Sequence, residues 1–223
     1  MLLTTLWAYL HFSFIYLLIV TNIISVMLLF TVNRLYVSSI KNIIFVTVLI
    51  FCLFNNIAVA AAHALEVHGL ERVAIADFDV HHGNGTEEIF AGDERVLMVS
   101  TFQHPFYPYS GIDGFSERMV NVPLAAYSGG DKFRAAVTEH WLPALERFKP
   151  QMIFISAGFD AHRDDDMAML RLVEADYAWV TQQLKSIADR YAQGRIVSML
   201  EGGYELHALG RSVAAHLKVL GEF

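Results

Sequence analysis

Residues 74–85 read AIADFDVHHGNG: an apolar β-type run that ends in two acids and two histidines beside glycines. Asp79 and His81 are two residues apart, so in an extended segment their side chains project from one face and can bind one ion. A carboxylate oxygen and an imidazole nitrogen both suit a divalent ion such as zinc. The alternative is a polar turn, because Asp and Gly also mark loops.

Two further apolar runs end in the same manner. Residues 153–162 read IFISAGFDAH and deliver Asp160, and residues 195–204 read RIVSMLEGGY and deliver Tyr204. In a parallel α/β sheet the ligand crevice lies outside the carboxyl ends of the strands, so these ends should converge. An Asp, a His and a second Asp leave a fourth metal position open for water and substrate, as catalytic zinc sites require.

Four blocks carry a family resemblance: 51–56 (FCLFNN), 77–86 (DFDVHHGNGT), 158–162 (GFDAH) and 201–204 (EGGY). Together they resemble the zinc-dependent histone deacetylase and acetylpolyamine amidohydrolase family. Asn84 and the EGGY form resemble its class II side. The resemblance implies an arginase-like α/β fold over residues 51–223, with a parallel sheet flanked by helices. It also implies zinc (Zn2+) as cofactor and hydrolysis of the acetyl amide of N-acetyl-lysine or of an acetylated polyamine.

The same resemblance assigns the catalytic core. Asp79, His81 and Asp160 match the family's zinc ligands, and Tyr204 matches the tyrosine that polarises the acetyl carbonyl. These roles agree with the chemistry, because a metal acts as a Lewis acid and a phenol O–H stabilises an oxyanion.

Further roles follow from the resemblance around this core. Asp77 matches a carboxylate that hydrogen-bonds a catalytic histidine and helps to hold a structural potassium ion (K+), with Ser100 near the same site. Phe51 and Tyr107 match the aromatic walls of the acetyl-lysine tunnel. Ordinary core packing is the alternative for both aromatic residues.

The chain departs from the family before the first block. Family members carry two adjacent histidines there, which supply the general base and its partner, whereas residues 37–45 read VSSIKNIIF. The histidine that precedes His63 is His11, alone in an apolar run. The family's amino-terminal part is thus expected to be truncated or replaced. The rival hypothesis is a non-catalytic, membrane-anchored, metal-binding remnant that lacks the histidine pair, or a gene model whose start is wrong.

Residues 1–50 form an apolar leader without Asp or Glu, in which Arg34 and Lys41 are the charged residues. Residues 6–32 are long enough for a transmembrane helix. The two basic residues that follow would hold its carboxyl side in the cytoplasm, giving a membrane-associated protein with a cytoplasmic domain. Without such a span the protein would be cytoplasmic. The apolar run 43–54 is short for a span and is interpreted as buried core or as aberrant sequence.

Charge and cysteine content narrow the function classes. The chain has a net charge of -7, and residues 51–223 hold 14 basic and 23 acidic residues, a net of -9. Such an acidic body argues against direct nucleic-acid binding. The single cysteine, Cys52, excludes an internal disulfide.

The remaining pattern alternates helices and strands, as in an α/β domain. We expect a strand at 96–101, a helix at 56–69 with Asn56 as its N-cap, and helices at 131–148 with a kink at Pro143, 170–191 and 206–220. His82 should point away from His81 and make a structural hydrogen bond. His162 with residues 163–166 is interpreted as a solvated loop at the rim of the site, a second metal cluster being the alternative.

Overall fold

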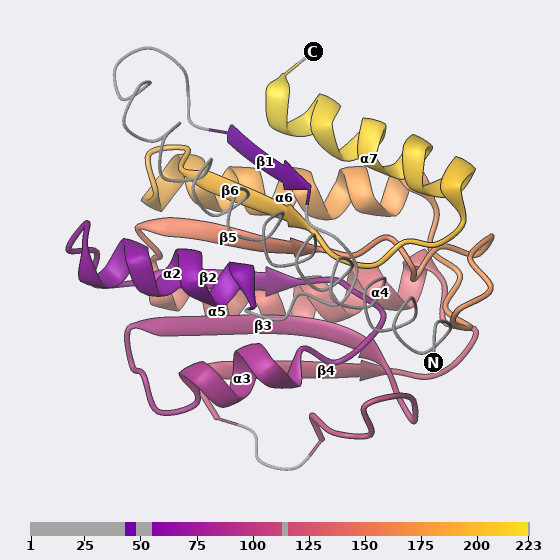
Figure 1. Ribbon diagram of the computed structural model, residues 1–223, viewed down its shortest axis with the longest axis horizontal. Coiled ribbons are helices and arrows are strands. Elements are labelled where there is room, and N and C mark those ends of the chain that lie inside the picture. Colours follow the sequence, from indigo (N-terminus) through magenta and orange to yellow (C-terminus); the bar gives the residue numbers. More distant parts are fainter. Residues whose placement is uncertain (1–42, 48–54, 113–115, 223) are drawn as a thin grey trace, which may run out of the picture.

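The computed structural model describes residues 43–47, 55–112 and 116–222. Its centre is a six-stranded sheet in the order β1-β6-β5-β2-β3-β4, and every neighbouring pair is parallel (Figure 1). The strands are β1 Ile43–Thr47, β2 Val73–Asp77, β3 Val96–Gln103, β4 Met119–Leu124, β5 Met152–Ala157 and β6 Ile196–Leu200. The expected parallel α/β class is confirmed.

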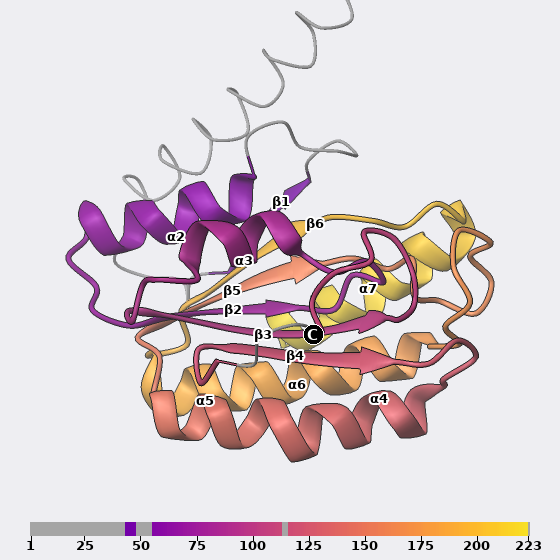
Figure 2. The same ribbon diagram turned by 90° about the horizontal axis from the view of Figure 1, so that it is seen from below.

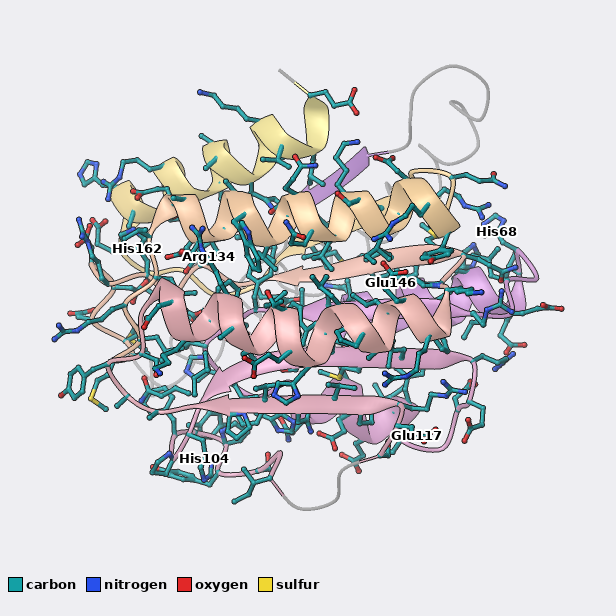
Figure 3. All side chains as sticks on the ribbon, turned by 180° about the vertical axis from the view of Figure 1, so that it is seen from behind. His68, His104, Glu117, Arg134, Glu146 and His162 are labelled. Atoms are coloured by element: carbon teal, nitrogen blue, oxygen red, sulfur yellow. The ribbon has the colours of Figure 1, made fainter. Side chains whose placement is uncertain are left out.

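Helices cover both faces of the sheet (Figure 2). On one face lie α2 (Asn56–Glu66) and α3 (Asn84–Phe90). The other face carries α4 (Gly130–Ala136), the π-helix η1 (Val137–Trp141), α5 (Leu142–Phe148), α6 (Glu174–Tyr191) and α7 (Leu206–Gly221), as Figure 3 shows from behind. Because helices cover both faces, every residue of β2 and β3 is buried, and residues 73–76 and 96–99 are continuous apolar runs rather than alternating ones.

Two apolar cores lie between the sheet and these helix layers. The larger joins strand residues such as Ile153 to Trp141 of η1 and Leu184 of α6. The smaller joins Ile75 and Phe154 of the sheet to the alanine-rich face of α2. Because strands β2 to β6 contribute residues to both cores, the loops at their carboxyl ends start from a rigid edge.

The strand register decides which loops meet. Central strand β2 lies between β3 and β5, so Asp77 at its end is level with Ser100 and Ser156. On the far side of β5, Ala157 is level with Leu200 at the end of β6. The segments that follow β2, β5 and β6 therefore leave one edge of the sheet side by side, as parallel topology requires.

Several helix boundaries differ from the expected ones. The side chain that caps α2 is Asn55, whose Oδ1 accepts from Ala58 N at 3.1 Å, so Asn56 is the first helical residue rather than the cap. Helix α6 begins at Glu174, not at residue 170, because Leu172 instead forms a parallel bridge with His162. Pro143 lacks an N–H for the helical ladder, and the π-turns of η1 directly before it accommodate that gap.

The leader falls mostly outside the described residues. The candidate span 6–32 and Phe51 both lie there. Within the described ranges, no helix has the length and apolar character to cross a membrane. Residues 43–47, in the range expected to be leader, form β1, which pairs in parallel with β6 at the border of the sheet.

Candidate metal centre

Three side chains from two strand ends meet at the carboxyl edge of the sheet. Asp79 and His81 follow β2, and Asp160 follows β5. The distance from His81 Nδ1 to Asp79 Oδ1 is 3.0 Å, and from His81 Nδ1 to Asp160 Oδ2 it is 3.3 Å. One potential ligand atom from each residue lies within 4.8 Å of the others. The sequence-based prediction that these three residues converge is confirmed.

Glycines from the neighbouring loops make room for the two carboxylates. A Cβ atom on Gly158 would lie 2.2 Å from Asp79 Oδ2, and one on Gly202 would lie 2.0 Å from Asp160 Oδ2. Any side chain at either position would collide with a carboxylate. Gly158 of the GFDAH block and Gly202 of the EGGY block are therefore required by close approach to the acids.

Backbone amides hold both oxygens of Asp79 but only one oxygen of Asp160, and His81 N donates to Asp79 Oδ1 at 2.9 Å. Val80 N donates to Asp160 Oδ1 at 2.9 Å, and Gly202 N donates to Asp79 Oδ2 at 2.9 Å. Asp160 Oδ2 is buried, and among the described residues no donor reaches it with hydrogen-bond geometry. A buried carboxylate oxygen without a donor costs free energy unless a cation binds it, so the donor set fits a divalent metal ion.

The electrostatics of the centre also favour a cation. Burial, reinforced by the charge of Asp79, raises the pKa of Asp160 to about 7, and the same two causes raise the pKa of Glu201 to about 8. Burial and Asp79 also raise the pKa of Asp77 well above its usual range. The pKa of His81 is lowered by burial but raised more by Asp160 and Asp79, and reaches about 10. The single positive charge of the His81 imidazole cannot balance the negative charges of these acids.

Tyr204, on the loop after β6, lines the same cavity. The cavity has a volume of about 690 Å³ and is also lined by Asp79, His81, Phe106 and Tyr107. Burial and the charges of Asp160 and Asp79 raise the pKa of Tyr204 to about 12. The phenol therefore keeps its proton at neutral pH and can donate a hydrogen bond into the cavity.

Asp77 is the last residue of β2, two residues before Asp79, and it lies next to β3. Its Oδ1 accepts from Asp79 N at 3.0 Å, and a Cβ on Gly83 would lie 2.5 Å from its Oδ2. The hydroxyl of Ser100, level with Asp77 across the sheet, is buried without a hydrogen-bond partner in the part of the chain that the structure describes. An unpartnered hydroxyl beside a buried acid suits a monovalent cation, and the structural potassium ion stays a prediction.

The aromatic wall consists of more than the sequence indicated. Tyr107 is 62% exposed and meets the His81 ring edge-on, with centroids 6.3 Å apart, so it is a residue of the cavity mouth and not of the core. Phe106, which was not predicted, stacks on His81 with a centroid distance of 5.3 Å. Its position next to Tyr107, in a loop that reaches the edge of the site, is the feature that could have revealed it.

The two other histidines near the site behave differently from each other. His82 points away from His81: its Nδ1 lies 2.9 Å from Ser110 Oγ and its Nε2 lies 2.6 Å from Glu87 Oε2. This confirms the expected structural hydrogen bond.

The interpretation of residues 162–166 as a solvated loop holds for Arg163, Asp164 and Asp166, which are exposed, but it is wrong for His162. His162 is 1% exposed, and its Nδ1 accepts from Asp164 N at 3.1 Å, because the chain turns back over the ring. Asp165, three residues after His162, is also buried. A charge-rich run resembles a solvated loop in sequence, so nothing in the pattern revealed this burial.

Comparison with known proteins places this site in a family. The sequence profile of the histone deacetylase domain matches residues 51–220. Histone deacetylase 14, chloroplastic, from Arabidopsis thaliana is 42% identical over 176 residues, and the histone deacetylase-like amidohydrolase of Pseudomonas aeruginosa is 43% identical over 161 residues. These matches cover 76% and 69% of this chain, respectively, but 42% of each relative.

Solved structures agree with the sequence relatives. The HDA15 HD domain aligns with a TM-score of 0.71 at 39% identity, over 77% of this chain and 51% of that one. The histone deacetylase Clr3 aligns with a TM-score of 0.70 at 35% identity, over 76% of this chain and 30% of that one. The resemblance inferred from the four sequence blocks is thus confirmed, and the chain belongs to the histone deacetylase family.

Proposed function

We propose that this chain is a zinc-dependent deacetylase that hydrolyses the acetyl amide of N-acetyl-lysine or of an acetylated polyamine. One observation carries the proposal: ligand atoms of Asp79, His81 and Asp160 converge beside a cavity that Tyr204 lines. Family membership supports the reaction type, while the choice between the two substrates rests on the resemblance alone.

Each residue of the centre has a distinct task. Asp79, His81 and Asp160 would hold Zn2+, which supplies Lewis acidity when bound. Tyr204 would donate its phenolic hydrogen to the acetyl oxygen, where negative charge develops in the transition state. Phe106 and Tyr107 provide apolar surface beside His81 for the methylenes of the substrate arm.

Proton transfer has to occur without the histidine pair that serves it in the family. No histidine lies between His11 and His63, where the family carries its catalytic pair. Loss of general acid–base catalysis costs roughly a hundredfold to ten-thousandfold in rate. The same absence favours a second candidate, a non-catalytic metal-binding remnant. Membrane attachment through residues 6–32 and a cytoplasmic location of the domain stay proposals from the sequence.

An assay of zinc-loaded protein with an acetyl-lysine peptide tests the proposal. We expect weak turnover, which Tyr204→Phe lowers by about a hundredfold or more because the oxyanion loses its donor. Tyr127→Phe is the matched control, since Tyr127 is exposed and packs under Arg171. Absence of turnover in folded, zinc-loaded parent and both variants would support the remnant. Turnover at the level of an intact relative would mean that another residue supplies the base.

A further inference from the structure

Asp165 is a buried carboxylate on the loop that follows β5. It is 4% exposed, and its Oδ2 accepts from the backbone N–H of Tyr204 at 2.6 Å and of Glu205 at 3.1 Å. Its Oδ1 accepts from Met167 N at 3.0 Å. No lysine or arginine among the described residues forms an ion pair with it. The Asp165 carboxylate is thus hydrogen-bonded by three backbone amides, and two of them belong to the loop that carries Tyr204.

The Tyr204 loop is held at two points. At one end Gly202 N donates to Asp79 Oδ2 at 2.9 Å, and Gly202 O accepts from Phe159 N at 2.7 Å. At the other end is Asp165. Between them Gly203 has φ +140°, a region in which a residue with a side chain is strained. The permissive glycine leaves the direction of the chain at Tyr204 to be set by the anchors on either side.

Asp165 is itself rigidly connected to the metal centre. It follows Asp160 by five residues, and Asp165 N donates to His162 O at 3.0 Å. Asp164 N donates to the Nδ1 of the buried His162 ring at 3.1 Å. A tight turn therefore fixes Asp165 relative to a metal ligand, and its carboxylate fixes Tyr204 relative to the turn.

We propose that Asp165 is a positioning residue that holds Tyr204 at the distance from the metal centre at which its phenol meets the acetyl oxygen. The proposal rests on the proposed function only for the identity of that acceptor. Charge-assisted hydrogen bonds to two successive amides are strong and directional, so a neutral group at this place holds the loop less well.

Amide hydrogen exchange tests the anchor without any need for activity. In zinc-loaded Asp165→Ala we expect the amides of residues 201–205 to exchange at least about tenfold faster, because two charge-assisted hydrogen bonds are lost. The control is Asp164→Asn, which removes the neighbouring exposed carboxylate and its contact with Arg211 at 3.0 Å; there exchange at 201–205 should stay unchanged. If the amides of Asp165→Ala exchange faster throughout the protein, the fold as a whole is destabilised, and the isosteric Asp165→Asn is then used to test the local anchor. Unchanged protection of residues 201–205 in a folded Asp165 variant would overturn the proposal.

A double-mutant cycle separates positioning from general support of the fold. The probe is the affinity of an N-acetyl-lysine peptide for zinc-loaded protein. We expect Tyr204→Phe to weaken binding about fivefold to tenfold, through loss of one hydrogen bond. Asp165→Asn should weaken binding severalfold in the parent and less than about twofold in the Tyr204→Phe background, since it acts through the phenol. Equal losses in both backgrounds would overturn the proposal. Failure of the zinc-loaded parent to bind peptide would count against the proposed function, while the exchange result still decides whether Asp165 anchors the loop.

Discussion

Glycines make room for carboxylates at two places in the molecule, the start of α6 and the metal centre, but the carboxylates have different partners there. At the start of α6, Asp176 is 3% exposed, and a Cβ on Gly130 would lie 2.2 Å from its Oδ1. That oxygen accepts from Arg134 Nε at 2.8 Å, and Oδ2 accepts from Val173 N at 3.0 Å (Arg134 is labelled in Figure 3). At the metal centre, glycines again make room for acids. Among the described residues, however, no lysine or arginine pairs with Asp79 or Asp160.

The difference shows how a structural acid can be told from a ligand. The chain itself provides the cation for Asp176, so that carboxylate is satisfied when the protein folds. The acids of the metal centre share one imidazole, and burial together with the charge of Asp79 still raises the pKa of Asp160 to about 7 and that of Asp77 well above its usual range. Burial of carboxylates without enough positive charge costs free energy, which an external cation can restore on binding.

The largest expected effect follows directly from this comparison. Asp160→Asn should weaken zinc binding on the order of a thousandfold, more than the tenfold to hundredfold that loss of an outer-shell partner costs. Asp176→Asn should lower the free energy of unfolding but leave the zinc affinity unchanged, because its partner is Arg134. Competition titrations with a chromophoric chelator measure both affinities. Equal loss of zinc in the two variants would remove the distinction.

A buried histidine extends the comparison to pH. His216 is 0% exposed between Thr181 and Ser198, and burial lowers its pKa to about 4. Its folded pKa is below the unfolded value of about 6.5, so the stability it contributes is complete above pH 6.5 and is lost as the pH falls to 4, up to roughly 3 kcal/mol. In metal-free His216→Gln, denaturant titrations should no longer show this part of the fall in the free energy of unfolding between pH 6.5 and 4. An unchanged pH profile would show that His216 is not held neutral.

A pair of glycine substitutions tests the close approach at the metal centre. Gly202→Ala places a Cβ 2.0 Å from Asp160 Oδ2 and should lower stability by about 1–3 kcal/mol as well as weaken zinc binding. Gly210→Ala, inside α7 with nothing within 4 Å, should raise stability by about 0.5–1 kcal/mol. Thermal and chemical unfolding of both variants measures the contrast. Equal effects of both substitutions would show that the Asp160 carboxylate moves aside at no cost.

The sequence was sufficient for the class of fold and for the three converging residues. Continuous apolar runs that end in acids predict buried parallel strands, and the carboxyl ends of such strands must meet, so Asp79, His81 and Asp160 could be placed together without coordinates. The His82 side chain followed from the alternation of an extended segment.

What the sequence did not reveal depends on tertiary contacts. The burial of His162 and Asp165 arises because a charged loop folds over the ring and toward the Tyr204 loop, and no local pattern encodes such a contact. The start of α6 was misplaced because Leu172 has helical spacing but bridges His162. Strand β4 and helix α3 were missed, since both are only partly buried and neither has a continuous apolar run.

The position of bound zinc tests the central claim most directly. A crystal of zinc-loaded protein, with data collected at the zinc absorption edge, locates the ion independently of activity. We predict one strong anomalous peak within about 2.0–2.2 Å of a carboxylate oxygen of Asp79, a carboxylate oxygen of Asp160 and Nδ1 of His81. The claim would be contradicted if no peak lay between Asp79 and Asp160 and the zinc were found elsewhere. One such place is beside the His63 and His68 rings, whose centroids lie 5.0 Å apart.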